Sequence, residues 1–174
     1  MAKLRRWRAY RRLERPYTRV SKYKKKSFIR MRPNIKIAKF ETGDPRKKFE
    51  WSVHLVPKKS IQIRQEAIES ARQTSNRLLE KSLGKAGFYF KLRVFPYHIL
   101  RENPLAAGAG ADRMSTGMQK SFGKPMGVAA QITTGQEIFT VKVDKLNMGV
   151  AKAALTRAAK KLPCSFSIKT AENQ

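Results

Sequence analysis

The sequence predicts an α+β fold, a single two-layer domain with a mostly antiparallel sheet and two helices on one face. Three observations support this prediction: several short segments alternate apolar and polar residues, two longer segments repeat apolar residues at helical spacing, and no linker or internal repeat divides the chain. The 174 residues suit one domain over 34–174, with a basic arm over 1–33 and a long glycine-rich internal loop over 101–127.

Two strands are expected before the first helix. In 34–41, Ile35 and Ile37 alternate with their neighbours, and 49–57 alternates more regularly, with apolar residues on one face and polar residues on the other. Because His54 belongs to the polar face, we expect its imidazole to face solvent or RNA.

Each expected helix has an apolar stripe and a stop signal. The first lies within 63–87 and is ended by Gly84 or Gly87, and the second follows Asn147 as a cap and stops at Pro163. The apolar stripes are Ile68, Ala71, Ser75, Leu78 and Leu79 in the first helix and Val150, Ala151, Ala154, Leu155, Ala158 and Leu162 in the second.

The remaining strands flank these helices. Strand composition returns over 88–101, where Pro96 breaks it, and again over 127–143, where two short strands turn at Thr134–Gly135. Residues 164–170 can add an edge strand.

Charge is the dominant feature of the composition. The chain has 39 Lys and Arg against 12 Asp and Glu, a formal net charge of +27, and residues 1–39 hold 16 of the cations with one acid, Glu14. A polyanion relieves the self-repulsion of such a chain, so a nucleic-acid partner is expected. An anionic membrane surface is the less favoured partner for this charge, and no apolar run approaches the roughly 20 residues that span a bilayer, so no membrane partner is expected. The single cysteine, Cys164, indicates a reducing, cytoplasmic location.

The arm over 1–33 interleaves cations with aromatic residues. Aromatic rings stack on unpaired bases while Lys and Arg neutralise phosphates, so this segment is expected to bind RNA. The alternative is a charged segment that is merely solvated. The candidate RNA-binding residues of the arm are Arg5, Arg6, Trp7, Arg8, Arg11, Arg12, Arg15, Arg19, Lys22, Lys24, Lys25, Lys26, Arg30 and Arg32.

The loop over 101–127 carries five of the ten glycines of the chain. Glycine lets a main chain approach phosphates closely, and Arg113, Lys120 and Lys124 add positive charge, so these three residues are further RNA-binding candidates. The alternative is a surface loop without a role, although loops of this length in compact domains are mostly functional or disordered.

Phosphate-cradle motifs fail in this loop. From Gly117 the spacing to Gly123-Lys124 is one residue longer than a Walker cradle requires, and Pro125 stands where a magnesium-binding hydroxyl is needed. We therefore expect no nucleotide cofactor.

Catalytic and metal-binding constellations are also missing from the sequence. His54 and His98 have no cysteine or carboxylate at ligand spacing, and His98 suits a bend or the edge of the core. Cys164 has no adjacent base and suits a small buried position. Of the two acids that bracket the loop, Glu102 and Asp112, the second is expected to accept hydrogen bonds from loop donors. No catalytic residue and no metal site is predicted.

The run ADRMSTGMQKSFGKPMG over 111–127 resembles the signature of the universal ribosomal-protein family called L sixteen in bacteria and L ten-e in archaea and eukaryotes. The resemblance extends to RPYTR in the arm, EAIESARQTSNRLLEK, GFYFKLRVFPYHILREN and TTGQEIFTVKV, and is closest to the archaeal type. Gln119 stands where most relatives are expected to carry arginine. The matching signature residues are Ala111, Asp112, Arg113, Gly117, Met118, Ser121, Phe122, Gly123, Lys124, Pro125 and Gly127.

The resemblance implies a hammerhead-like sheet and a structural role in the large ribosomal subunit. Members of the family bind large-subunit ribosomal RNA near the peptidyl-transferase centre and help shape the aminoacyl-tRNA site. The implied partners are this RNA, tRNA at the A and P sites, and neighbouring ribosomal proteins. By this resemblance 113–127 contacts ribosomal RNA, and the tip over 101–112 approaches tRNA through Arg101, Glu102, Asn103, Gly108, Gly110 and Asp112.

Two other functions stay open from the sequence. An RNA-modifying or tRNA-acting enzyme with a basic arm would need a catalytic constellation. A general DNA-compacting protein would bind duplex DNA and structured RNA equally well.

Overall fold

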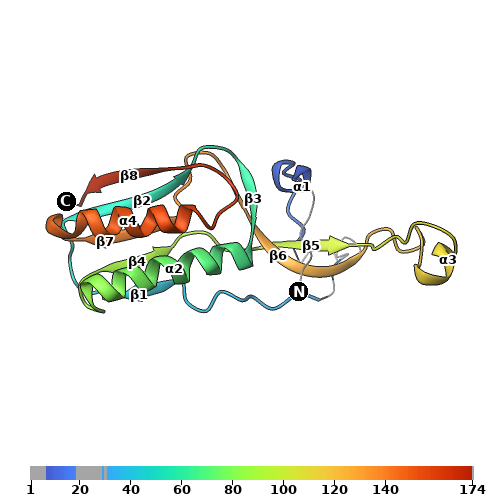
Figure 1. Cartoon of the computed structure of the whole chain (residues 1–174), viewed down its shortest axis with the longest axis horizontal. Coiled ribbons are helices and arrows are strands. Elements are labelled where there is room, and N and C mark those ends of the chain that lie inside the picture. Colours follow the sequence, from blue (N-terminus) through green and yellow to red (C-terminus); the bar gives the residue numbers. More distant parts are fainter. Residues whose placement is uncertain (1–6, 19–28, 30, 174) are drawn as a thin grey trace.

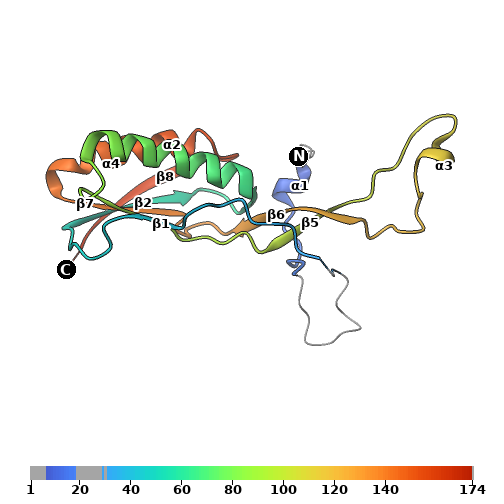
Figure 2. The ribbon, with the colours of Figure 1, turned by 90° about the horizontal axis from the view of Figure 1, so that it is seen from below.

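The computed structural model describes residues 7–18, 29 and 31–173. These residues form an elongated molecule, in which a body of two sheets and two long helices extends into a projecting loop (Figure 1). The carboxyl end of the described chain lies at the opposite end of the molecule from the tip of this loop (Figure 2).

The larger sheet has five antiparallel strands in the order β1-β4-β7-β2-β8. Strand β2 pairs with a strand on each side: Trp51 of β2 lies opposite Val143 of β7 on one side and opposite Glu172 of β8 on the other. The edge strand expected near 164–170 is confirmed as β8. The strands are β1 (Glu41–Gly43), β2 (Trp51–Pro57), β4 (Tyr89–Leu92), β7 (Phe139–Val143) and β8 (Phe166–Glu172).

The smaller sheet has three antiparallel strands in the order β3-β6-β5. These strands are β3 (Ile61–Arg64), β5 (His98–Glu102) and β6 (Lys124–Ile132). The β5–β6 pair carries a register shift between Leu100 and Arg101, and the projecting loop continues from the far end of this pair (Figure 1). The smaller sheet is therefore the support of the loop.

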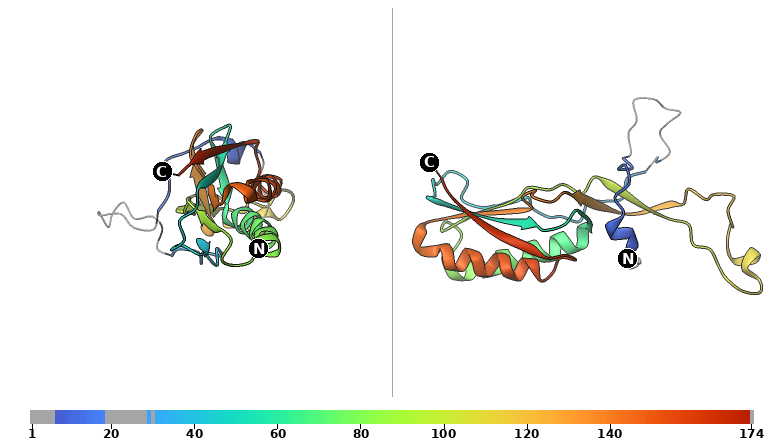
Figure 3. Two further views of the ribbon diagram at one scale, coloured as in Figure 1. Left: turned by 90° about the vertical axis from the view of Figure 1, so that its left-hand side faces the viewer. Right: turned by 90° about the horizontal axis from the view of Figure 1, so that it is seen from above.

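Two long helices, α2 (Gln65–Leu83) and α4 (Met148–Ala159), cover one face of the larger sheet (Figure 3). The expected apolar stripes face the core, and of the two predicted stops, Gly84 and Gly87, it is Gly84 that ends α2, with a positive φ of 67°. Asn147 holds the N-cap position of α4 without a side-chain capping bond. The short helices are α1 (Arg8–Arg11), α3 (Ala111–Met114) and the 3₁₀ turn η2 (Lys145–Asn147).

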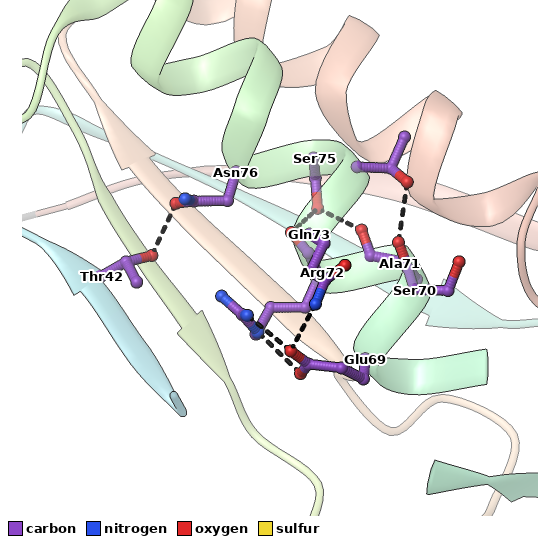
Figure 4. A network of polar contacts seen from close by, with 9 residues as sticks. Thr42, Glu69, Ser70, Ala71, Arg72, Gln73, Ser75 and Asn76 are labelled. Atoms are coloured by element: carbon purple, nitrogen blue, oxygen red, sulfur yellow. Dashed lines mark hydrogen bonds and ion pairs between the residues drawn. The ribbon is translucent and has the colours of Figure 1, made fainter. Parts of the chain in front are cut away.

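A buried ion pair between Glu69 and Arg72 lies on α2. The Arg72 guanidinium donates to both carboxylate oxygens of Glu69, at 2.9 Å from Nε to Oε2 and 2.7 Å from Nη2 to Oε1 (Figure 4). These hydrogen bonds lower the pKa of the Glu69 carboxyl below its usual value. Glu69 also accepts a hydrogen bond from the backbone of Ala38, so the pair ties α2 to the segment before β1.

The strand expected over 34–41 is wrong for most of its length, because only its last residue enters β1. Side chains of α2 take its backbone hydrogen bonds instead. The Lys36 N–H donates to Gln65 Oε1 at 2.9 Å, and Gln65 Nε2 donates to the carbonyl of Asn34 at 3.3 Å. Ile35 and Ile37 still pack on the core, which explains their alternation.

The two strands expected around Thr134–Gly135 exist, but they belong to different sheets, β6 to the smaller and β7 to the larger. The strand β3 is an addition to the expected elements. It has only four residues and leads directly into α2, so its pattern merges with the start of that helix.

The prediction that His54 faces solvent or RNA is wrong. The imidazole is buried, with Nδ1 3.0 Å from Thr140 Oγ1 and 3.2 Å from a carboxylate oxygen of Glu137. Burial lowers the pKa of His54 although Glu137 opposes the shift, so the neutral ring is favoured. Side-chain contacts of this kind keep His54, on the polar face of β2, away from solvent.

The close approach of Gly43 to β4 generates a stability prediction. Gly43 has φ 91°, and a Cβ atom there would lie 2.1 Å from the carbonyl oxygen of Phe88. We expect Gly43→Ala to lower the free energy of unfolding by about 2–4 kcal/mol, from left-handed strain plus this clash. Urea denaturation measures the loss.

Gly135→Ala is the matched control, since Gly135 has φ 86° and open space around it. It should cost only about 1–2 kcal/mol of left-handed strain. Equal losses in the two variants would contradict the role given to the Gly43 contact.

Candidate nucleic-acid interface

The structure describes about half of the predicted RNA-binding residues. These are Trp7, Arg8, Arg11, Arg12, Arg15, Arg32, Arg113, Lys120 and Lys124. The six predicted tRNA-proximal residues also belong to described segments, and the description of Arg8 and Asp112 is confined to the backbone. The predictions that lie outside the described residues are Arg5, Arg6, Arg19, Lys22, Lys24, Lys25, Lys26 and Arg30.

The described part of the arm crosses the smaller sheet. Helix α1 contacts β3, the carbonyl of Glu14 accepts a hydrogen bond from Gln131 Nε2 of β6 at 3.0 Å, and Tyr17 lies against β5. The arm is therefore seated on the body at these points. Its cations Arg11, Arg12 and Arg15 are exposed.

Tyr17 joins β5 through its backbone. The Tyr17 N–H donates to Nδ1 of His98 at 2.9 Å, and the Ile99 N–H donates to the carbonyl of Tyr17 at 2.8 Å. Buried Ile29 packs with Ile99 and Val128 in a small second core that Tyr17 and Phe122 partly cover. The prediction of His98 as a residue at the edge of the core is confirmed.

Arg101 lies at the root of the loop, between two aromatic rings. Its guanidinium carbon is 4.0 Å from the ring centroid of Tyr17 and 3.9 Å from that of Phe122. Its Nη1 donates to the carbonyl of Phe122 at 2.8 Å, and the two rings meet edge-on at 5.8 Å between centroids. Cation–π contacts and this hydrogen bond thus join the arm, β5 and the returning side of the loop. We refer to Tyr17, Arg101 and Phe122 as the loop root.

The loop root corrects the expected extent of the tip. Arg101 and Glu102 belong to β5, whereas Gly108, Gly110 and Asp112 lie further out. Asn103 marks the transition, because its Nδ2 donates to the carbonyl of Gly117 at 3.1 Å and closes the neck of the loop.

Glycine is required where the loop returns to the root. Gly123 has φ 79°, and a Cβ atom there would lie 2.8 Å from the carbonyl oxygen of Glu102. Arg113 and Lys120 of the loop and Lys124 at the start of β6 are exposed, as are the apolar side chains of Leu105, Met114 and Met118 in the loop. The loop therefore presents cations and adaptable apolar surface together.

The carboxylates that form ion pairs among the described residues belong to the body. They bind neighbouring cations there. The pairs are Glu66 with Lys36 and Arg64, Glu69 with Arg72, Asp144 with Lys47, Glu41 with Lys91, and Glu137 with Arg93. By contrast Arg12, Arg15, Lys120 and Lys124 make no ion pair with any residue that the structure describes. These exposed charges are available to an external anion.

Arg32 differs from the other cations of the arm. Its guanidinium carbon lies 5.1 Å from the ring centroid of Phe95, and its Nη2 donates to the carbonyl of Pro96 at 3.2 Å. The residue therefore fastens the end of the arm to the body, a role that the charge pattern alone does not indicate.

Two basic grooves escaped the sequence predictions. One lies between α2 and α4, where Arg77, Lys81 and Arg157 meet hydroxyl and amide side chains. The other brings Trp7 and Arg11 of the arm to Lys58 and Lys59 of the β2–β3 turn. The paired lysines of that turn were the only local signal for the second groove, because the groove forms only when distant segments meet.

The described residues hold no sign of a metal or redox site. No three His, Cys, Asp or Glu side chains within them gather closely enough to hold a metal ion. Cys164 is half-buried, and burial raises the pKa of its thiol, which favours the unreactive protonated form. Among the helices of the described chain, none has the length and apolar character needed to cross a bilayer.

Comparison with known proteins gives a consistent result. Residues 17–169 match the family described as ribosomal protein L16p/L10e. The chain is 43% identical over 161 residues to the large ribosomal subunit protein uL16 of Archaeoglobus fulgidus, covering 92% of this chain and 89% of the relative. Relatives with the same name are 45% identical over 148 residues in Thermofilum pendens (85% and 84% covered) and 43% over 161 residues in Methanococcus maripaludis (92% and 90% covered).

The loop root generates a prediction about order in the loop. Arg101→Ala removes the cation from between the rings of Tyr17 and Phe122 and should speed amide hydrogen exchange over 103–123 while leaving the larger sheet unchanged. Arg101→Lys should restore only part of the protection, because an ammonium lacks the planar stacking group.

Arg113→Ala serves as the control, since Arg113 is exposed near the far end of the same loop. Its exchange rates should match those of the unmodified chain. If Arg101→Ala left the loop as protected as Arg113→Ala does, the loop root would not be its anchor.

Proposed function

Because the chain belongs to the L16p/L10e family of ribosomal proteins, we propose that it is a non-catalytic structural constituent of the large ribosomal subunit and binds large-subunit ribosomal RNA. The observation that supports this most strongly is the exposure of the arm and loop cations without carboxylate partners among the described residues. Such cations release counterions when they neutralise phosphates, which drives binding.

We propose that two parts of the loop bind different RNA molecules. Lys124, at the start of β6, contacts ribosomal RNA beside the smaller sheet, and Lys120 and Arg113 contact it further out along the loop. The outer residues over 103–112 approach tRNA near the peptidyl-transferase centre and help shape the aminoacyl-tRNA site. A glycine-rich backbone suits this approach because it exposes N–H groups to phosphates.

The arm is proposed as the second RNA contact. Its seat on the smaller sheet fixes Arg11, Arg12 and Arg15 relative to the loop root, so that one RNA surface can meet both. Preorganised contacts of this kind bind more tightly because less freedom is lost on association. Neighbouring ribosomal proteins are the remaining proposed partners, and the cytoplasm is the proposed location.

An RNA-modifying enzyme is the other function that the basic arm permits. The family consists of ribosomal structural proteins rather than enzymes, and neither of the two basic grooves is lined by a described histidine or carboxylate. Turnover of a tRNA or ribosomal RNA substrate by the purified chain would be the observation in favour of an enzyme.

The arm cations generate a prediction about salt dependence. We expect Arg12→Gln/Arg15→Gln to flatten the slope of log K against log salt for ribosomal RNA by about 1.4–1.8, the value for two lost phosphate contacts. Filter binding between roughly 50 and 200 mM salt measures the slope.

A double variant of equal charge, Lys48→Gln/Lys145→Gln, controls for net charge. Both lysines are exposed on the body, outside the arm and the loop. The slope should change much less in this variant, and an equal change in both doubles would rule out a specific role for the arm.

The tip of the loop can be tested separately, because the Asn103–Gly117 hydrogen bond brings the two sides of its neck together. Replacing 104–116 by a short glycine linker should leave the body folded and should retain most of the affinity for ribosomal RNA. Large subunits carrying this chain should bind aminoacyl-tRNA at the A site more weakly, as measured by nitrocellulose retention.

Arg113→Gln is the control for the loss of a single charge with the tip in place. It should leave tRNA binding close to that of the unmodified chain. Normal tRNA binding by subunits with the shortened loop would contradict the role of the tip.

A further inference from the structure

The groove between the arm and the β2–β3 turn has features of a nucleotide site. It encloses a volume of about 790 Å³, within the range of small-ligand pockets. Three separate segments line it: Trp7 and Arg11 of the arm, Lys58 to Ile61 of the turn, and Leu162 to Ser165 after α4. A site assembled from three segments of one domain is held in place by the fold itself.

One wall of the groove can stack on a base. The Trp7 side chain is 44% exposed, an unusual state for an indole in a folded segment. The guanidinium carbon of Arg11 lies over the same ring, 4.9 Å from its centroid. Indole and guanidinium planes are the side chains on which unpaired bases stack, whereas paired bases within a duplex offer no free face.

A second part of the lining can bind a phosphate. Lys58 and Lys59 are exposed, and neither makes an ion pair with a residue in the described part of the chain. The turn that carries them is attached to the segment after α4, because the Lys58 N–H donates to the carbonyl of Ser165 at 3.0 Å. Two ammonium groups on one turn suit a phosphodiester.

The remaining surface matches the sugar and the edge of a base. The side chains of Ile61 and Leu162 are buried and give the groove an apolar part, while Ser165 and Ser60 supply hydroxyl groups, of which that of Ser60 already accepts a hydrogen bond from the Thr134 N–H at 3.1 Å. None of the described residues that line the groove is acidic. The groove therefore offers a complementary group to each part of an anionic ligand that has an aromatic ring and a sugar.

We propose that this groove binds one unpaired nucleotide of RNA, with its base on Trp7 and Arg11 and its phosphate on Lys58 and Lys59. The proposal rests on the proposed function in that the RNA partner is ribosomal. It adds a specific ligand and assigns Lys58 and Lys59, which lie outside the arm and the loop, to RNA binding.

Tryptophan fluorescence tests the proposal directly. The chain has two tryptophans, so the full chain with Trp51→Phe leaves Trp7 as the reporter. The probes are an oligoadenylate of about ten nucleotides and an abasic oligomer of the same backbone length. We expect the oligoadenylate to quench Trp7 and the abasic oligomer to bind with little quenching, because quenching needs the stacked base.

Affinity measurements give a second readout in the natural sequence. Trp7→Ala should lower the affinity for the oligoadenylate about tenfold and leave that for the abasic oligomer unchanged, while Trp7→Phe should keep most of the affinity. Lys58→Gln/Lys59→Gln should flatten the salt slope by about 1.4, the single-strand value for two contacts, and Lys48→Gln/Lys145→Gln should not.

Equal quenching by both oligomers overturns the proposal, as does quenching by an acidic peptide such as oligoglutamate but by neither oligomer. Binding of large-subunit ribosomal RNA is measured on the same preparations. If the chain binds that RNA and the oligoadenylate without a base-dependent change at Trp7, the nucleotide site is wrong and the proposed function stands. If the chain does not bind that RNA, the proposed function itself fails, and this inference with it.

Discussion

Electrostatic self-repulsion is the constraint on which the rest of this structure depends. A chain with 39 cations and 12 carboxylates must fold although its charges oppose compaction. All of the carboxylates except Glu14 and Asp112 lie outside the arm and the outer loop, and on the body they hold cations in pairs such as Glu69–Arg72. The arm over 1–33 carries 14 cations and one carboxylate, about half of the excess of positive charge, and the loop adds exposed cations, so an RNA backbone can neutralise both segments.

The arm and the loop are held together by a cation, the Arg101 guanidinium, which has a structural role. Arg101 lies between the rings of Tyr17 and Phe122, so one guanidinium connects the arm, the smaller sheet and the return of the loop. An arginine in an RNA-binding segment is therefore not in itself an RNA contact, and Arg32 on Phe95 is a second example. Because the anchors are internal, the described cations of the arm and the loop that we propose as RNA contacts are fixed relative to each other before RNA binds, which lowers the entropic cost of association.

Local sequence patterns predicted those helices and strands whose apolar and polar residues repeat regularly within the element itself. The period of α2, its stop at Gly84 and the alternation of β2 were sufficient to place these elements. Contacts between distant segments could not be predicted. The pairing of β3 with β6 and the stacking of Arg101 on Tyr17 produce no periodic pattern of residues in the sequence. Within the candidate site, charge and aromatic content identified the arm and loop. The groove at Trp7 was missed since it exists only where three segments converge.

Co-sedimentation tests the central claim most directly, namely that the acid-poor arm and loop hold this chain on the large ribosomal subunit. Purified chain is added to large subunits depleted of it, and the mixture is centrifuged through sucrose after a high-salt wash. The account predicts that the unmodified chain stays with the large subunit, while a variant with neutral residues at Arg11, Arg12, Arg15, Lys120 and Lys124 is released. Retention of this variant, or loss of the unmodified chain, would contradict the account.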